Sequence, residues 1–219
     1  MKYWFKLALY LIVLLGFSAS HAGSYEDFFR AIARDNADEI TQLLARGFDP
    51  NTVNPKGVPG LLVALQEPSP KAAAALLDHP DLEAEVRTAQ DESPLMLAAL
   101  RGYTALCAKL IERDADVNKP GWAPLHYAST NSHIEIIRLL LDNHAYIDAA
   151  SPNGSTPLMM AAMYGNASAV KMLLEAGADP TLKNGVGLTA IEFASRVKKA
   201  ESVEILAAFI RARRPKGSW

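Results

Sequence analysis

The chain has 219 residues, of which 50% are hydrophobic and 21% are charged. This is the composition of a folded globular protein, and it is too apolar for a disordered chain. The 22 Lys and Arg residues nearly balance the 24 Asp and Glu residues, giving a formal net charge of -2. The sequence therefore lacks the basic excess that nonspecific nucleic-acid binding uses. Because Cys107 is the single cysteine, an internal disulfide and a cysteine-rich zinc site are both excluded.

Residues 1–22 carry the pattern of a secretory signal peptide. Lys2 and Lys6 precede an apolar run over residues 7–17, and Ser20 and Ala22 occupy the small-residue positions of a cleavage site. The run of 11 residues is shorter than the roughly 20 residues that a helix needs to span a bilayer. We predict a cleaved signal peptide and a periplasmic location in a Gram-negative bacterium. An uncleaved inner-membrane anchor is the alternative.

The next feature along the chain is an internal repeat. Related segments read Ser93-Pro-Leu-Met-Leu-Ala-Ala99, Ala123-Pro-Leu-His-Tyr-Ala128 and Thr156-Pro-Leu-Met-Met-Ala-Ala162. Pro124 and Pro157 are 33 residues apart, as are Thr156 and Thr189, whereas Pro94 and Pro124 are 30 apart. Self-similarity at such a period is typical of stacked helical repeats.

The spacing and the residues resemble the ankyrin repeat, which carries T-P-L-H-x-A at a period of 33 residues. The stretch Pro124–Ala128 is the closest match. The resemblance implies an all-α solenoid of stacked helix-turn-helix units with short hairpin loops. We predict one ankyrin domain over residues 23–211 with about six units, near 25–53, 54–87, 88–118, 119–150, 151–183 and 184–211. The first and last units are degenerate, and a basic tail follows over residues 212–219.

Individual residues within the units have predictable roles. Thr156 is expected to cap a helix that begins at Pro157. Gly102 and Gly165 are expected to end the first helices of their units in a left-handed turn. Asp114 and His144 stand where a glycine normally follows the second helix, so left-handed backbone there would be strained.

Two connections depart from the regular pattern. Pro68 and Pro70 predict an irregular loop between the helices of the second unit. The linker over residues 118–121 is three residues short of the regular spacing, so the hairpin there should be clipped.

No arrangement of nucleophile, base and orienting group indicates catalysis, and no cofactor or metal motif is present. His126 occupies the motif histidine position, for which a structural hydrogen bond to a neighbouring loop is expected. Cys107 lies at an apolar position of a second helix, which favours burial. A redox-reactive thiol is the alternative and would require exposure and a lowered pKa.

Trp122 is the strongest candidate for contact with a partner, because it precedes a first helix on the expected concave side and aromatic residues are enriched at binding hot spots. Packing on Pro120 within the shortened loop is the alternative. We expect Trp122→Ala to weaken binding and leave thermal unfolding nearly unchanged. The other partner-binding candidates are equivalent hairpin positions and the inner ends of first helices: Glu92, Ser155, Leu188, Arg101, Thr130, Asn131, Met163 and Tyr164.

The resemblance implies a noncatalytic protein-binding module rather than an enzyme. The resemblance to small exported ankyrin proteins of bacteria further implies either support of catalase-dependent peroxide resistance or neutralisation of a toxin. An accessory or scaffold protein for a partner is therefore expected, and an immunity or inhibitor protein is the alternative. We expect a monomer that binds another protein and no nucleic acid. Membrane contact is expected only through the N-terminal segment or the basic tail.

Overall fold

Short stretches with an apolar face fold into helices along residues 23–213, the part of the chain that the computed structural model describes. Within this range the one β-bridge is an isolated antiparallel pair between Val53 and Pro59. The all-helical prediction is confirmed. The predicted signal peptide and residues 214–219 of the predicted tail lie outside the described residues. Within residues 23–213, every helix is too short or too polar to cross a bilayer.

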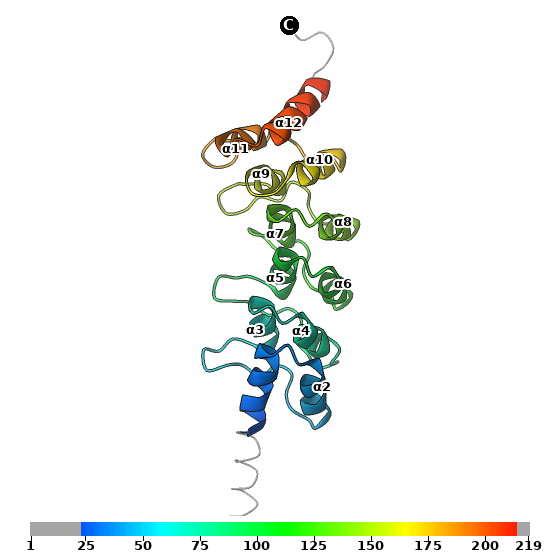
Figure 1. Ribbon diagram of the computed structural model, residues 1–219. Helices are drawn as coiled ribbons and strands as arrows, with labels where there is room; N and C mark the ends of the chain where they lie inside the picture. The colour runs from blue at the N-terminus through cyan, green and yellow to red at the C-terminus, as the bar shows by residue number, and fades with distance from the viewer. Residues whose placement is uncertain (1–22, 214–219) are drawn as a thin grey trace, which may run out of the picture. The chain divides into compact units, whose positions relative to one another are not determined.

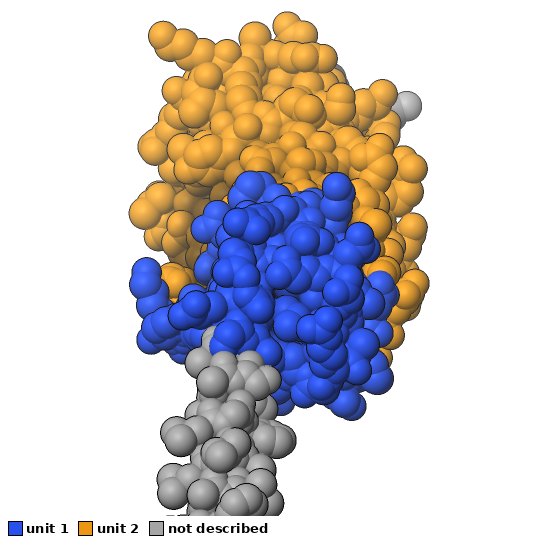
Figure 2. Space-filling view, turned by 60° about the horizontal axis from the view of Figure 1, so that its bottom comes forward, with its two compact units in different colours: residues 1–83 blue, residues 84–219 orange. Residues whose placement is uncertain are grey.

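The chain divides into two compact units, residues 1–83 and 84–219 (Figure 2). In the first unit, residues 23–33 are helical and are followed by α2 (Ala37–Ala45), α3 (Gly60–Gln66) and α4 (Pro70–Leu77). Phe28 and Ile32 are fully buried together with Leu61 and Leu65 of α3 and Leu76 of α4. These side chains form the apolar core of the unit.

The second unit contains four helix pairs in two rows. The inner row consists of α5 (Pro94–Arg101), α7 (Pro124–Thr130), α9 (Pro157–Met163) and α11 (Ala190–Arg196), and each of these helices packs on the next. The outer row consists of α6 (Thr104–Glu112), α8 (Ile134–Asp142), α10 (Ala167–Glu175) and α12 (Ala200–Arg213). Figure 1 shows the connecting loops before α9 and α11 projecting on the side of the inner row opposite α8 and α10.

Small residues let the inner helices approach closely. Ala98 and Ala99 of α5 and Ala161 and Ala162 of α9 are fully buried. The outer helices contribute an apolar stripe, of which Val170, Leu173 and Leu174 on α10 are buried as expected. The core therefore lies between the two rows and between successive pairs.

The helix caps agree with the predicted signals. Thr156 accepts a hydrogen bond from the backbone N–H of Met159, and α9 begins at Pro157. Asp114 and His144 are left-handed, with φ of 60° and 65°. In the second helix pair of the chain, α3 ends at Gln66 and α4 starts at Pro70, so the prolines produce the expected irregular connection.

Gly102 and Gly165 behave differently from each other. Gly102 ends α5 in the left-handed region, with φ of 77°, as predicted. The same prediction for Gly165 is wrong, because Gly165 has no positive φ. A Cβ at Gly165 would lie 2.7 Å from the carbonyl oxygen of Ser129 and 2.9 Å from that of Ala161. Glycine is required there for close approach between α7 and α9, rather than for its backbone angles.

Four hairpins share one hydrogen-bonding pattern. Each begins with a residue whose N–H donates to the carbonyl oxygen four positions later, over 54–58, 88–92, 151–155 and 184–188. The side chain of this first residue also accepts from the N–H of the fifth, as Asn184 does from Leu188 at 2.9 Å. In the linker between α6 and α7, residues 118–122 form no hydrogen bond of this kind. The hairpin there is clipped, as the repeat spacing predicted.

Candidate interaction site around Trp122

The clipped linker before α7 is held by a buried lysine. The Lys119 side chain is only 8% exposed, and its ammonium pairs with the carboxylate of Asp91 on the preceding hairpin. The same Nζ donates to the carbonyl oxygen of Pro120 at 3.1 Å. The hydrogen bond from Lys119 holds the pKa of the Asp91 carboxyl below its ordinary value. The Lys119–Asp91 ion pair holds this linker, which lacks the hairpin hydrogen bond of the other units. Gly121, with φ of 80°, directly precedes Trp122.

His126 supports the start of α7 from within the core. Its Nδ1 accepts from the backbone N–H of Ala123 at 3.1 Å, and its Nε2 lies 3.0 Å from the carbonyl oxygen of Ser155. Because a carbonyl oxygen only accepts, Nε2 carries the proton and the imidazole is neutral. Burial lowers the pKa of His126, which favours the same neutral form. The predicted structural role of the motif histidine is confirmed.

The half-buried indole of Trp122 packs against two side chains of α7. Its ring centroid lies 5.4 Å from that of His126 and 6.4 Å from that of Tyr127, with interplanar angles of 76° and 84°. Such edge-to-face pairs contribute about 0.5–1.5 kcal/mol each beyond burial. The ring contacts of Trp122 are therefore with α7, and its packing on Pro120 stays a prediction.

An open cavity of about 200 Å³ lies beside this indole. We call it the Trp122 pocket and define it by its lining residues, which come from α5, α7, α9 and the loop before α7: Leu100, Trp122, His126, Tyr127, Thr130 and Met160. The walls are mostly apolar and aromatic, with the hydroxyls of Thr130 and Tyr127 as polar groups. Thr130 Oγ1 donates to the carbonyl oxygen of His126 at 2.9 Å.

The carboxylate of Glu92 adjoins the pocket. Tyr127 donates its hydroxyl to Oε1 of Glu92 at 3.1 Å. Burial, followed by the charge of Glu92, raises the pKa of the Tyr127 hydroxyl, so it remains a neutral donor. The other carboxylate oxygen, Oε2, receives a long 3.4 Å hydrogen bond from Thr88. Glu92 and Trp122 occupy the same position in consecutive units, and Tyr127 connects them.

The structure brings together some of the predicted partner-binding residues and separates others. Trp122 and Thr130 line the pocket, and Glu92 adjoins it through Tyr127. Ser155 is 2% exposed, so its side chain is not available to a partner, which corrects its inclusion. Its carbonyl oxygen instead accepts from His126.

The remaining candidates lie on the same unit but outside the pocket lining. Asn131 is exposed and donates to the carbonyl oxygen of Leu100 at 2.8 Å. Arg101 is exposed at the end of α5, and Tyr164, 57% exposed, follows α9. Met163 and Leu188 are half-buried. For these five residues, contact with a partner stays a prediction.

Tyr127 and Met160 line the pocket but were not predicted from the sequence. Tyr127 fills the variable position of the Pro124–Ala128 motif, between a buried histidine and a buried alanine. The signal that could have identified Tyr127 from the sequence is an aromatic residue at a variable position of the repeat motif. Met160 gave no such signal, because its role depends on α9 packing beside α7.

A family model described as ankyrin repeats in three copies matches residues 28–120, 61–151, 95–184 and 143–214. These overlapping matches cover nearly all the described residues. The chain belongs to the ankyrin-repeat family.

Solved ankyrin structures have the same fold. The human ASB11 ankyrin repeat domain has a TM-score of 0.76 and 28% identity, and the alignment covers 83% of this chain and 82% of that one. The ankyrin repeat protein EF0377 has a TM-score of 0.71 and 26% identity, with 83% and 96% covered.

Curated relatives include longer proteins that share the ankyrin segment. The mouse B-cell lymphoma 3 protein homolog is 30% identical over 154 residues, which are 67% of this chain and 34% of that protein. The Drosophila melanogaster tyrosine-protein kinase Shark is 28% identical over 185 residues, 82% of this chain and 20% of that protein. The chain thus spans about a third or less of the length of these two relatives.

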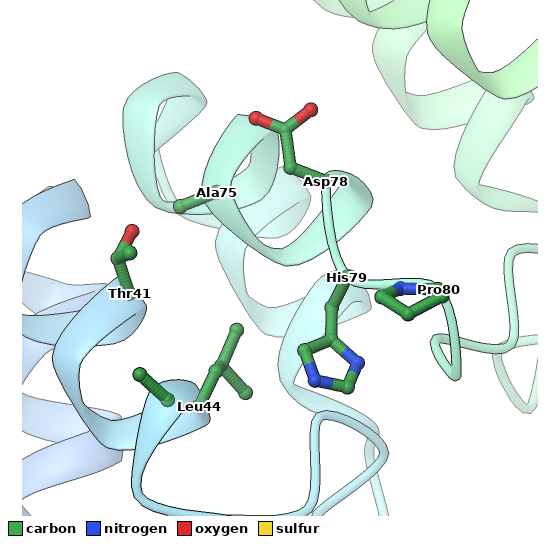
Figure 3. A pocket seen from close by; sticks show the side chains of 7 residues that line it. Thr41, Leu44, Ala75, Asp78, His79 and Pro80 are labelled. Carbon is green, nitrogen blue, oxygen red and sulfur yellow. The ribbon is translucent and has the colours of Figure 1, made fainter.

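Two further cavities lie beside second helices of the ankyrin repeats. One, of about 310 Å³, lies between α2 and α4 and is lined by Thr41, Leu44, Asp78, His79 and their neighbours. Figure 3 shows the Asp78 carboxylate and the His79 ring pointing in different directions, so they do not converge on one point. The other, of about 540 Å³, lies between α10 and α12. Neither contains a pair of aromatic walls.

Cys107 is fully buried on α6. Burial raises the pKa of its thiol to about 12, whereas a reactive thiol requires a lowered one. The prediction of a buried structural cysteine is confirmed, and the redox alternative is contradicted. Among residues 23–213, no three His, Cys, Asp or Glu side chains are grouped closely enough to hold a metal ion.

Proposed function

We propose that this ankyrin-repeat chain is a noncatalytic module that binds another protein through the Trp122 pocket. Ankyrin repeats generally serve as protein-binding scaffolds, which supports the general class of function. The observation that carries the proposal is the open, aromatic-lined cavity on the inner row of the second unit. Function on a repeat scaffold depends on sites carried at its surface rather than on the fold itself.

A small central anchor can supply most of the binding energy of such a site. Buried aromatic anchors that fill or form pockets account for most of the affinity at many interfaces. Trp122 is already held by Tyr127 and His126, so little side-chain freedom is lost on binding. The Trp122 pocket is thus a preorganised cavity that a side chain of the partner can enter.

The test compares partner capture by the parent protein and by Trp122→Ala. We expect the variant to lose about 2 kcal/mol of binding free energy, or roughly thirty-fold in affinity, as for a hot-spot residue. Its unfolding temperature should fall modestly, because the edge-to-face contacts with α7 are removed. The ring contacts with α7 therefore revise the sequence-based expectation that Trp122→Ala leaves thermal unfolding nearly unchanged.

Two further variants separate binding from folding. Thr130→Arg places a long side chain at the pocket and leaves the indole in place, so it should also reduce capture. Tyr146→Ala removes a 67% exposed aromatic side chain that does not line the pocket, and should leave capture unchanged. Unchanged capture by both pocket variants, with folding verified by circular dichroism, would rule out the proposed site.

We also propose that the protein is exported and acts as an accessory to its partner in the periplasm. The charged, apolar and small-residue segments of residues 1–22 support export. Mass spectrometry of the protein recovered with its partner should find Gly23 at the N-terminus; an intact Met1 would favour the uncleaved anchor. A partner enzyme of peroxide defence would support the accessory role, and a secreted toxin would support the immunity alternative.

A further inference from the structure

The electrostatic character of the Trp122 pocket indicates what kind of side chain it accepts. None of its lining residues is a lysine or arginine. The nearby Lys119 is paired with Asp91, whereas Glu92 accepts its hydrogen bonds from the neutral hydroxyls of Tyr127 and Thr88. A carboxylate offers about four acceptor positions. Both donors to the Glu92 carboxylate are therefore neutral, and acceptor positions remain for a cationic donor.

The aromatic lining adds a second attraction for a cation. Trp122 and Tyr127 both line the cavity, and the faces of aromatic rings carry the negative part of their quadrupole. A cation over a ring face is attracted, most strongly over tryptophan. The neutral His126 contributes no opposing charge at this wall.

The size and the apolar walls further restrict the occupant. A cavity of about 200 Å³ is below the roughly 300–1,000 Å³ of pockets that hold drug-sized ligands. Leu100 and Met160 suit the methylene stem of a long charged side chain. A guanidinium matches the rest of the site better than an ammonium, because it is planar, stacks on aromatic rings and can donate in a fork to a carboxylate.

We propose that the Trp122 pocket binds an arginine side chain of the partner protein, stacked on the aromatic wall and donating to Glu92. This inference rests on the proposed function and specifies the chemistry of the partner's anchor. A partner that presents only an apolar side chain would leave Glu92 unused.

The test uses the full chain with Trp4→Phe and Trp219→Phe, which makes Trp122 the single tryptophan. The probe is the tripeptide acetyl-Gly-Arg-Gly-amide, followed by the fluorescence of Trp122 and the NMR signal of its indole N–H. The lysine peptide and the citrulline peptide, a neutral isostere of the arginine one, serve as comparisons. We expect a saturable change with arginine, a weaker one with lysine and none with citrulline.

Glu92→Gln tests the carboxylate, since glutamine can still accept from Tyr127. We expect it to weaken binding of the arginine peptide about tenfold, by losing a charge-assisted hydrogen bond. Glu135→Gln, the same change at an exposed position of α8, is the matched control and should leave binding unchanged. Thermal unfolding of both variants verifies that they fold.

The outcomes separate this inference from the proposed function. Equal responses to arginine and citrulline peptides, or no response to either, would overturn the arginine assignment. If Trp122→Ala still lost the partner in that case, the pocket would remain the interaction site with a different anchor. If partner capture were insensitive to Trp122, the proposed function itself would fail.

Discussion

His126 shows how one residue of the repeat motif links stability to pH. Its two ring nitrogens join the start of α7 to the hairpin before α9, and this arrangement requires the neutral imidazole. The native pKa lies below the ordinary value of 6.5. As pH falls below about 6.5, the unfolded chain takes up a proton that the native state excludes, so stability decreases.

We therefore predict that the protein loses stability at acidic pH because of His126. Between pH 7.5 and 5.5 the free energy of unfolding should fall, with a slope from this residue approaching about 1.4 kcal/mol per pH unit. His126→Gln should lower stability at pH 7.5 and remove this part of the slope. Urea unfolding at several pH values measures both effects. An identical pH slope in the parent and the variant would contradict the assignment.

Single residues also mark where sequence reasoning succeeded and where it did not. Thr156 and Pro157 were predictable because a cap acts through its own helix. Gly165 and Ser155 were not, because their roles depend on neighbouring repeats. A carbonyl of α7 approaches Gly165, and His126 bonds to the backbone of Ser155. The helical period was therefore visible in the sequence, while contacts between repeats were not.

At the scale of the element, asparagine side chains connect successive loops. In the second unit, Asn118 donates to the carbonyl oxygen of His144 at 2.8 Å and accepts from the N–H of Tyr146 at 2.7 Å. In the first unit, Asn51 makes the same two bonds with Asp81 and Glu83, both at 2.8 Å. These bridges satisfy backbone groups that the turns after second helices leave without helical partners.

Removing the Asn118 bridge should destabilise the second unit. Asn118→Ala loses two hydrogen bonds to backbone, each worth about 0.5–1.5 kcal/mol, so a loss of about 1–3 kcal/mol is expected. Asn143→Ala is the matched control, because Asn143 makes a single local bond to Leu139 in α8. Chemical denaturation measures both variants. A larger loss for Asn143→Ala than for Asn118→Ala would argue against the bridge.

The Trp122 pocket itself is a product of several elements. Its walls come from three inner helices and a clipped hairpin, so only Trp122, Thr130 and the adjoining Glu92 were found among the predicted partner-binding residues. The three-residue deficit in the repeat spacing did indicate which hairpin would be clipped. Which side chains would then face the cavity depended on the packing of α5, α7 and α9.

At the scale of the whole molecule, we propose that the inner row of the second unit carries the partner-binding surface. Hydrogen–deuterium exchange of the parent protein, with and without its captured partner, tests this claim most directly. We predict that the partner slows exchange in α7 and in the loops that carry Glu92 and Trp122, while the outer helices α6 and α8 are unchanged. Protection confined to the outer helices, or to the first unit, would contradict the account.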